Sequence, residues 1–360
     1  MRVLVYSAQM ESIGGIESHV VEFCLHLSKA GHRITLMSSR FALNANATHL
    51  LREAGVELLV NGRRWSSGSP WRKWLWTVLS LLRVAHRPFD VVYTNGQGRN
   101  VAVVLGWFKG RARRVHHHHT SCDQADIATW PRAYARAMKR ADAVVVCAEF
   151  IRGRMQAAID RADVSVVYCF SPQLIPGATS PTQPDTRVVF GYFGRLIPEK
   201  GIDWILRLSE EPRLAHIAWR IWGAESAYRA SDFQSYDRVE YRGSFSTPEG
   251  LRSAVAELQC FCLFSTHPEG LPLSLLEIMS AGKPWIATSQ GGIPELSHDP
   301  DACLLVSLDD YAAVVAACLA MSERIIAGRI DAARQIAFYR SRFSAAALLP
   351  AWMNLLQGAA

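Results

Sequence analysis

Short apolar runs that alternate with helix-like segments are the feature that most constrains how this chain can fold. Seven such runs lie before position 170: Arg2–Ser7, Ile34–Met37, Val56–Val60, Val91–Thr94, Arg114–His118, Ala143–Cys147 and Val164–Tyr168. Six more follow: Val188–Gly191, Ala218–Trp222, Val239–Tyr241, Cys260–Leu263, Trp285–Ala287 and Cys303–Val306. Strands that alternate with helices predict parallel, doubly wound sheets. The expected fold class is therefore α/β, with two Rossmann-like halves.

A stretch rich in Pro, Ser and Thr separates the two sets of strands. It begins at Ser171 and has few residues able to pack, so we predict a linker over residues 171–186. We expect an N-terminal domain over residues 1–170 and a C-terminal domain over residues 187–335, with a last helix within 336–360 that packs back on the N-terminal domain. Two such domains facing each other form a cleft at the carboxyl ends of their sheets, where ligands bind in open α/β folds.

The charge of the chain is divided unevenly. Residues 1–180 carry a net charge of +11 and residues 181–360 carry −4, which together give the overall +7. A basic half is typical of proteins that meet nucleic acid, anionic lipid or phosphorylated substrates, and charge alone does not choose among them.

No segment is long and apolar enough to cross a bilayer. The richest run, Trp74–Leu82, has nine residues, whereas a spanning helix needs about 20. The first residues lead into a polar stretch and lack the long apolar core of a signal peptide, so we expect a cytoplasmic protein. Eight cysteines without CxxC spacing predict buried, reduced thiols and argue against a structural zinc site.

Two carboxylates eight residues apart mark the most informative segment, His267–Leu296. If a helix begins near Leu273, Glu269 lies in the loop before it and Glu277 about one turn inside. Backbone donors at a helix start favour a diphosphate, and nearby carboxylates can accept hydrogen bonds from sugar hydroxyls. The alternative is two ordinary solvated glutamates. The intervening Gly and Pro residues and the later Gly291 favour a ligand site, because they let backbone approach a ligand closely.

A second segment, Val189–Asp203, brings two basic residues to one loop. Arg195 follows a strand and Gly194, and Lys200 comes five residues later. A guanidinium fork and a mobile ammonium suit a pyrophosphate. The alternative is a surface loop with ordinary basic residues.

Taken together, these motifs resemble the family-4 retaining glycosyltransferases of the GT-B fold. The resemblance rests on FGRLIPEKG at 193–201, on the Glu-x7-Glu run at 269–277 and on GGIESHV at 14–20. It implies that the C-terminal domain binds a nucleotide diphosphate sugar and that the N-terminal domain binds the acceptor. It also implies retention of the anomeric configuration.

The resemblance assigns roles residue by residue. Arg195 and Lys200 would hold the donor diphosphate, Glu277 would bond the ribose hydroxyls, and Glu269 would contact the donor sugar as a catalytic group. Gly15 would approach the phosphate from across the cleft. The donor-binding loop would also include Gly270, Leu271 and Pro272.

Four consecutive histidines end the fifth expected strand, where such enzymes carry a histidine close to the transferred sugar. Strand alternation sends His117 and His119 to one face and His116 and His118 to the other, so the run cannot offer four ligands to one metal. By motif position, His119 is our catalytic candidate and His118 the second choice.

The resemblance also implies a base pocket near IWGAES at 221–226 and YRGSFS at 241–246. Its candidates are Trp222, Gly223 and Ser244. Tyr241 offers a second aromatic ring, although aromatic residues at strand ends are more often part of a core.

The expected reaction is hexosyl transfer without a metal or a cofactor, because the nucleotide sugar is itself a substrate. No Asp-x-Asp pair stands at a strand end, and the basic loop can neutralise the leaving diphosphate. We expect a front-face displacement in which a phosphate oxygen takes the acceptor proton, so that catalysis rests on positioning and charge stabilisation.

The stretch 63–87 reads as a basic amphipathic helix with four tryptophans, Trp65, Trp71, Trp74 and Trp76. Such a helix can lie on an anionic bilayer surface, and a second basic and aromatic patch at 107–114 favours that interpretation. We therefore expect a glycan or lipid-linked acceptor, in the cell envelope, and peripheral attachment to the inner face of the membrane. The alternative is a helix that packs on its own sheet.

Three other classes of protein are alternative interpretations of this sequence. A nicotinamide-dependent oxidoreductase is disfavoured because GGIESH lacks the third glycine of GxGxxG. A nucleic-acid-binding protein would leave the carboxylate and pyrophosphate motifs unexplained, so we expect no nucleic acid partner. A nucleotide-sugar 2-epimerase of similar fold is the nearest alternative.

Overall fold

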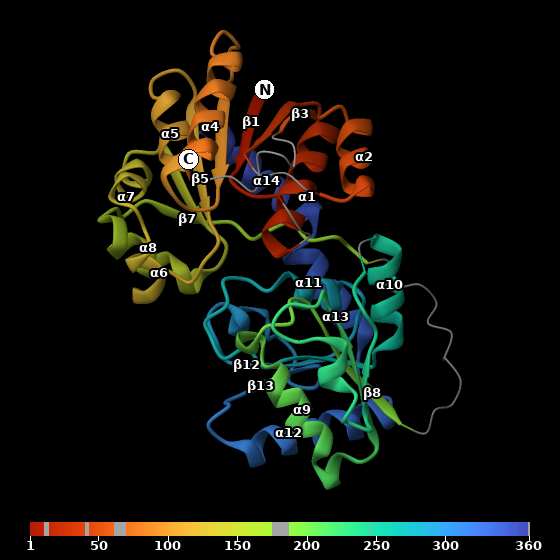
Figure 1. Cartoon of the computed structure of the whole chain (residues 1–360). Coiled ribbons are helices and arrows are strands. Elements are labelled where there is room, and N and C mark those ends of the chain that lie inside the picture. Colours follow the sequence, from red (N-terminus) through yellow and green to blue (C-terminus); the bar gives the residue numbers. More distant parts are fainter. Residues whose placement is uncertain (11–13, 40–42, 61–69, 175–186, 246, 359–360) are drawn as a thin grey trace. The chain divides into compact units, whose positions relative to one another are not determined.

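The computed structural model describes residues 1–10, 14–39, 43–60, 70–174, 187–245 and 247–358 (Figure 1). It divides into two compact units. Unit 1 comprises Met1–Ser171 and Ala345–Ala360, and unit 2 comprises Pro172–Ser344.

Unit 1 is built on a seven-stranded parallel sheet with the strand order β3-β2-β1-β4-β5-β6-β7. Its strands are β1 (Arg2–Ser7), β2 (Arg33–Ser38), β3 (Glu57–Val60), β4 (Val91–Asn95), β5 (Arg113–His118), β6 (Ala143–Val146) and β7 (Val164–Val166). The central strands are almost continuously buried, as strands covered by helices on both faces must be. The strand order reverses between β1 and β4, which pair in parallel with Val3 opposite Val91.

Helices surround this sheet. They are α1 (Gly15–Lys29), α2 (Ala45–Glu53), α4 (Pro70–Val84), α5 (Arg99–Trp107), α6 (Gln124–Ala128), α7 (Arg132–Lys139), α8 (Glu149–Ile159) and α14 (Ala345–Gln357). The last of these comes from the end of the chain and lies beside α1 (Figure 1). Its residues Leu348, Trp352 and Leu356 are buried in the core of unit 1, and the Trp352 indole donates to the Tyr168 carbonyl at 3.3 Å.

Unit 2 is built on a six-stranded parallel sheet with the order β10-β9-β8-β11-β12-β13. Its strands are β8 (Val188–Phe193), β9 (Ile217–Trp222), β10 (Val239–Tyr241), β11 (Cys260–Leu263), β12 (Trp285–Thr288) and β13 (Cys303–Val306). Its helices are α9 (Ile202–Glu210), α10 (Pro248–Glu257), α11 (Leu273–Ser280), α12 (Tyr311–Ile326) and α13 (Ala332–Arg342), with short 3-10 turns at Pro198–Lys200, Pro212–Leu214, Ala230–Phe233 and Ile293–Leu296.

The expected α/β fold class, with two Rossmann-like halves, is confirmed, and every expected strand forms. One expected boundary is wrong. Residue 336 lies inside α13, which belongs to unit 2, and the segment that joins unit 1 begins at Ala345. The break falls there because Arg342 ends one helix and the next starts three residues later. Most of the expected linker, residues 175–186, lies outside the described residues.

All eight cysteines are buried, as the sequence predicts. In the described part of the chain, no helix has both the length and the apolar character needed to cross a membrane.

Candidate active site

The candidate donor site of unit 2 lies where its strand order reverses. The first strand of the unit, β8, has β9 on one side and β11 on the other, so the loops that follow β8 and β11 leave the sheet side by side. Such a switch point is where open α/β sheets bind ligands. The loop after β8 carries Arg195 and Lys200, and the loop after β11 carries Glu269.

Glu269 is the centre of this site. Its side chain is only 9% exposed, and its Oε1 accepts a hydrogen bond from the Lys200 ammonium at 2.5 Å. The Ser265 hydroxyl donates to the same oxygen. Burial alone would raise the pKa of Glu269, but the Lys200 charge and the two hydrogen bonds outweigh burial and hold the pKa below its usual value. Glu269 is therefore an ionised hydrogen-bond acceptor, and not a proton donor, at neutral pH.

Two glycines let the surrounding loops close around Glu269. At Gly201, whose φ is +75°, an added Cβ would lie 2.0 Å from the Phe264 carbonyl oxygen. At Gly291, whose φ is +61°, it would lie 2.0 Å from the carbonyl oxygen of Glu269, which also accepts from the Gly292 amide at 2.9 Å. Backbone packs against backbone at both places, so any side chain would displace a loop.

The helix predicted near Leu273 begins at that residue as α11. Its N-cap is Pro272, which gives the helix no side-chain cap, so the first backbone amides keep the unsatisfied donors of a helix start. The loop residues Gly270 and Leu271 lead into it. Glu277 lies one turn inside the helix and is 8% exposed. The two glutamates are thus not solvated surface residues.

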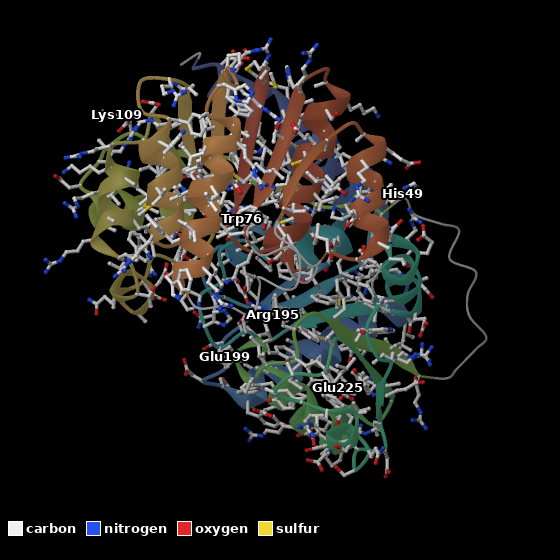
Figure 2. All side chains as sticks on the ribbon, turned by 45° about the horizontal axis from the view of Figure 1, so that its top comes forward. His49, Trp76, Lys109, Arg195, Glu199 and Glu225 are labelled. Carbon is white, nitrogen blue, oxygen red and sulfur yellow. The ribbon has the colours of Figure 1, made fainter. Side chains whose placement is uncertain are left out.

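The two basic residues of the expected diphosphate clamp differ in their surroundings. Arg195 is exposed, and no other side chain in the described part of the chain pairs with its guanidinium. Lys200 is instead held by Glu269. Figure 2 shows Arg195 and Glu199 on the loop after β8; the Glu199 carbonyl accepts from the Thr266 amide at 2.9 Å and so ties this loop to the one after β11.

The candidate base-pocket residues lie beside this site at the ends of β9 and β10. Trp222 is 5% exposed and packs near Gly191, so its ring belongs to the core and offers little surface for stacking. Gly223 accepts a hydrogen bond from the Tyr241 hydroxyl at 2.8 Å, and Ser244 is exposed. Tyr241 is partly exposed, and its ring stacks on that of buried Phe233 with ring centroids 5.2 Å apart.

In unit 1, Gly15 is the first residue of α1, directly after the loop that follows β1. It is exposed, and the N-cap residue Gly14 gives α1 no side-chain cap. The amides at this helix start therefore resemble those of α11 as donors for an anion.

The four histidines divide between the two faces of β5, as strand alternation predicts. His117 and His119 lie together, with ring centroids 3.9 Å apart. His116 and His118 both contact the Tyr134 hydroxyl, at 2.8 and 3.1 Å. Burial lowers the pKa of His116 and of His117 well below the usual value, so both are neutral structural residues.

The second catalytic candidate, His118, belongs to a hydrogen-bond network that the sequence does not predict. Its Nε2 contacts the Thr120 hydroxyl at 2.7 Å, and that hydroxyl donates to Asp126 at 2.6 Å. Asp126 also accepts from Gln97 at 2.8 Å. These bonds hold the pKa of Asp126 well below its usual value against the opposing effect of burial. His119, directly after β5, is partly exposed and free of this network. No short-range pattern in the sequence links positions 97, 118 and 126.

Similarity to known proteins identifies the class of this protein. A model of the glycosyl transferases group 1 matches residues 187–324, and a model of glycosyltransferase family 4 matches residues 13–170. The chain belongs to the group 1, family 4 glycosyltransferases of the GT-B fold.

Individual relatives are more distant. The putative colanic acid biosynthesis glycosyltransferase WcaL of Escherichia coli K12 is 22% identical over 239 residues, which cover 61% of this chain and 57% of the relative. The chain therefore spans less than two thirds of that relative's length.

Solved structures share the fold over nearly the whole chain. Anabaena HepE in complex with UDP and glucose is 18% identical with a TM-score of 0.75, and it is matched over 99% of both chains. Sucrose-phosphate synthase from Thermosynechococcus elongatus is 17% identical with a TM-score of 0.78, over 99% of this chain and 98% of that one.

Proposed function

We propose that this protein is a retaining, metal-independent glycosyltransferase that moves a hexose from a nucleotide diphosphate donor to a glycan or lipid-linked acceptor. One observation carries the proposal. An ionised carboxylate, Glu269, is fixed between Lys200 and the open N-terminus of α11 at the switch point of unit 2. An acceptor for sugar hydroxyls and donors for phosphate oxygens therefore lie in one site.

The chemistry assigned to each residue follows from its surroundings. Exposed Arg195 and the first amides of α11 bind the diphosphate, and Lys200 contributes positive charge that Glu269 partly offsets. Glu269 accepts from the sugar and stabilises positive charge that develops at the anomeric carbon. Because Glu269 is ionised, the acceptor proton passes to the leaving phosphate oxygen. Retention of the anomeric configuration requires that the acceptor attack from the same face that the phosphate leaves.

Identifying the donor is the most direct test of the proposed function. The Anabaena structure contains UDP and glucose, so UDP-glucose heads a panel of UDP, GDP and ADP sugars to be screened by thermal stabilisation. A donor present at 100 times its Kd should raise the stability by about 2.7 kcal/mol. Transfer with that donor should give a product of unchanged anomeric configuration. An inverted product would refute retention, and conversion of the donor without any acceptor would favour the epimerase.

Transfer should persist in excess EDTA. The proposal gives the diphosphate charge to Arg195, Lys200 and the α11 amides, so no divalent ion is needed at the donor. Initial rates with and without chelator should agree within error. Loss of activity that Mg2+ or Mn2+ restores would contradict this assignment.

The membrane part of the proposal rests on α4. Its buried side chains, Thr77, Ser80, Leu81 and Val84, occupy one face of the helix. Other positions around the helix are apolar but exposed: Trp71, Trp74, Leu79 and Leu82 are 58%, 47%, 46% and 54% exposed. Exposed Arg72 and Arg83 lie beside these residues. The helix thus packs on its own unit through one face only. Residues 63–69 of the expected basic helix lie outside the described residues.

Liposome co-sedimentation tests this surface. Apolar insertion and charge attraction of about 1 kcal/mol per basic residue should both contribute. We expect binding to anionic liposomes at low salt, reduced by Arg72→Glu/Lys73→Glu and, at all salt concentrations, by Trp71→Ala/Trp74→Ala. The matched control is Arg132→Glu/Arg136→Glu on α7, which reverses two exposed charges. Equal binding by all of these variants, or no binding by the wild type, would favour a soluble acceptor.

A further inference from the structure

A second constellation lies in unit 1 at the carboxyl ends of β5, β6 and β7. These strands are neighbours in the parallel sheet, so the residues that follow them emerge at one edge. His119 comes directly after β5, Cys147 directly after β6, and Cys169 three residues after β7. One ligand atom from each lies within 4.8 Å of the other two.

We propose that His119, Cys147 and Cys169 bind a thiophilic divalent metal ion, with Zn2+ as the reference ion. The spacing fits tetrahedral zinc. Bonds of about 2.3 Å to sulfur and about 2.0 to 2.1 Å to nitrogen place two such ligands about 3.6 Å apart. The His119 Nδ1 lies 3.6 Å from the Cys169 sulfur. Two thiolates and an imidazole are soft ligands, which select zinc over Mg2+.

The other candidate groups of the described residues are already satisfied. His19, His117 and His119 also approach one another, but both ring nitrogens of His19 are engaged, by the Phe170 amide at 2.9 Å and the Tyr93 hydroxyl at 3.1 Å. In the group of His118, Cys122 and Asp126, the histidine and the carboxylate belong to the Thr120 network. In the group of His119, Cys147 and Cys169, hydrogen bonds instead join the three residues to one another: the Cys169 sulfur lies 3.6 Å from His119 Nδ1, and the Cys147 thiol donates to the His119 carbonyl at 3.8 Å.

Binding is balanced by release of protons. The Cys147 and Cys169 thiols each lose a proton to solvent as Zn2+ binds, and no electron is transferred. Three protein ligands leave one tetrahedral position for water or another small ligand. All three ligands belong to unit 1, whereas Arg195, Lys200 and Glu269 belong to unit 2.

Cobalt substitution and zinc titration test the proposal on the full-length protein, reduced and freed of metal by a chelator. We expect one Zn2+ per chain by calorimetry. Co2+ should give the sulfur-to-cobalt charge-transfer band and the strong visible bands of a tetrahedral thiolate site. Cys147→Ala and Cys169→Ala should each weaken Zn2+ binding by about 100-fold or more, since loss of even a second-shell partner costs 10–100-fold. Cys24→Ala, which removes a buried thiol elsewhere in unit 1, should bind as the wild type does.

The Co2+ spectrum of the wild type tests the metal site even if a variant does not fold. A Co2+ complex without a charge-transfer band, or unchanged Zn2+ affinity in the Cys147→Ala/Cys169→Ala double variant, would overturn the site. Because these readouts require no sugar transfer, their failure would leave the proposed enzymatic function standing.

Discussion

Replacing Lys200 with Met is expected to destabilise unit 2 and to weaken nucleotide-sugar binding together. The ammonium is the positive charge that compensates the buried Glu269 carboxylate at 2.5 Å. Removing one partner of a buried ion pair leaves an uncompensated charge and typically costs about 3 to 5 kcal/mol. Loss of the same charge near the diphosphate should cost a further 1.5 to 3 kcal/mol of donor affinity, or roughly tenfold to over a hundredfold. Urea unfolding and calorimetric titration with UDP measure the two effects separately.

Two companion variants separate the roles of the ammonium. Arg195 is exposed and unpaired among the described side chains, so Arg195→Ala should lose donor affinity at little cost in stability. Lys200→Met/Glu269→Gln removes both charges and should recover most of the stability but none of the donor affinity. If Lys200→Met is as stable as Arg195→Ala, the ion pair does not hold this site together.

The effect of pH follows from the direction of the Glu269 pKa shift. In the wild type the pKa of Glu269 lies below the usual value of a glutamate, so the carboxylate contributes stability that is present above that usual value and is lost as the pH falls through its lower, folded-state value. Without Lys200, burial dominates and raises the pKa, so the variant loses stability as the pH rises. The stability difference between wild type and Lys200→Met should therefore shrink on acidification.

Local patterns predicted the fold well because each β-α unit carries its own signal. The apolar runs located all the strands, and the glycine and proline around position 272 located the start of α11 to the residue. The end of β7 was overestimated: the strand stops at Val166, although apolar residues continue to Tyr168. Tertiary packing explains this, since Tyr168 instead accepts a hydrogen bond from Trp352 of α14.

Relations between distant residues were harder to predict. Lys200 and Glu269 were assigned to one ligand, but their direct pairing depends on the adjacency of β8 and β11, which only the sheet order provides. The same holds for Cys147 and Cys169: the absence of CxxC spacing argued against zinc, yet neighbouring strands bring the two thiols together. Trp222 was a candidate for base stacking, and burial of its ring places it in the core.

Gly201→Ala should be strongly destabilising and should damage the donor site. Its φ of +75° is strained for alanine, and the new Cβ would meet the Phe264 carbonyl oxygen at 2.0 Å. Strain costs about 1 to 2 kcal/mol and overpacking about 1 to 3 kcal/mol more, because the obstructing atoms are backbone. Relief of the clash moves the loop that carries Lys200 away from the loop that carries Glu269, so transfer activity should fall with stability.

Gly328→Ala, after α12 in the same unit, is the matched control for this change. Its φ is +63°, and an added Cβ meets nothing within 4 Å. It should cost only the strain of about 1 to 2 kcal/mol, with donor affinity close to that of the wild type. Urea unfolding of both variants therefore isolates the clash. Equal destabilisation by the two substitutions would mean that close packing of the loops after β8 and β11 does not shape the site. A larger loss of stability at Gly201, accompanied by weaker UDP binding, would show that the geometry of the donor site depends on this backbone contact.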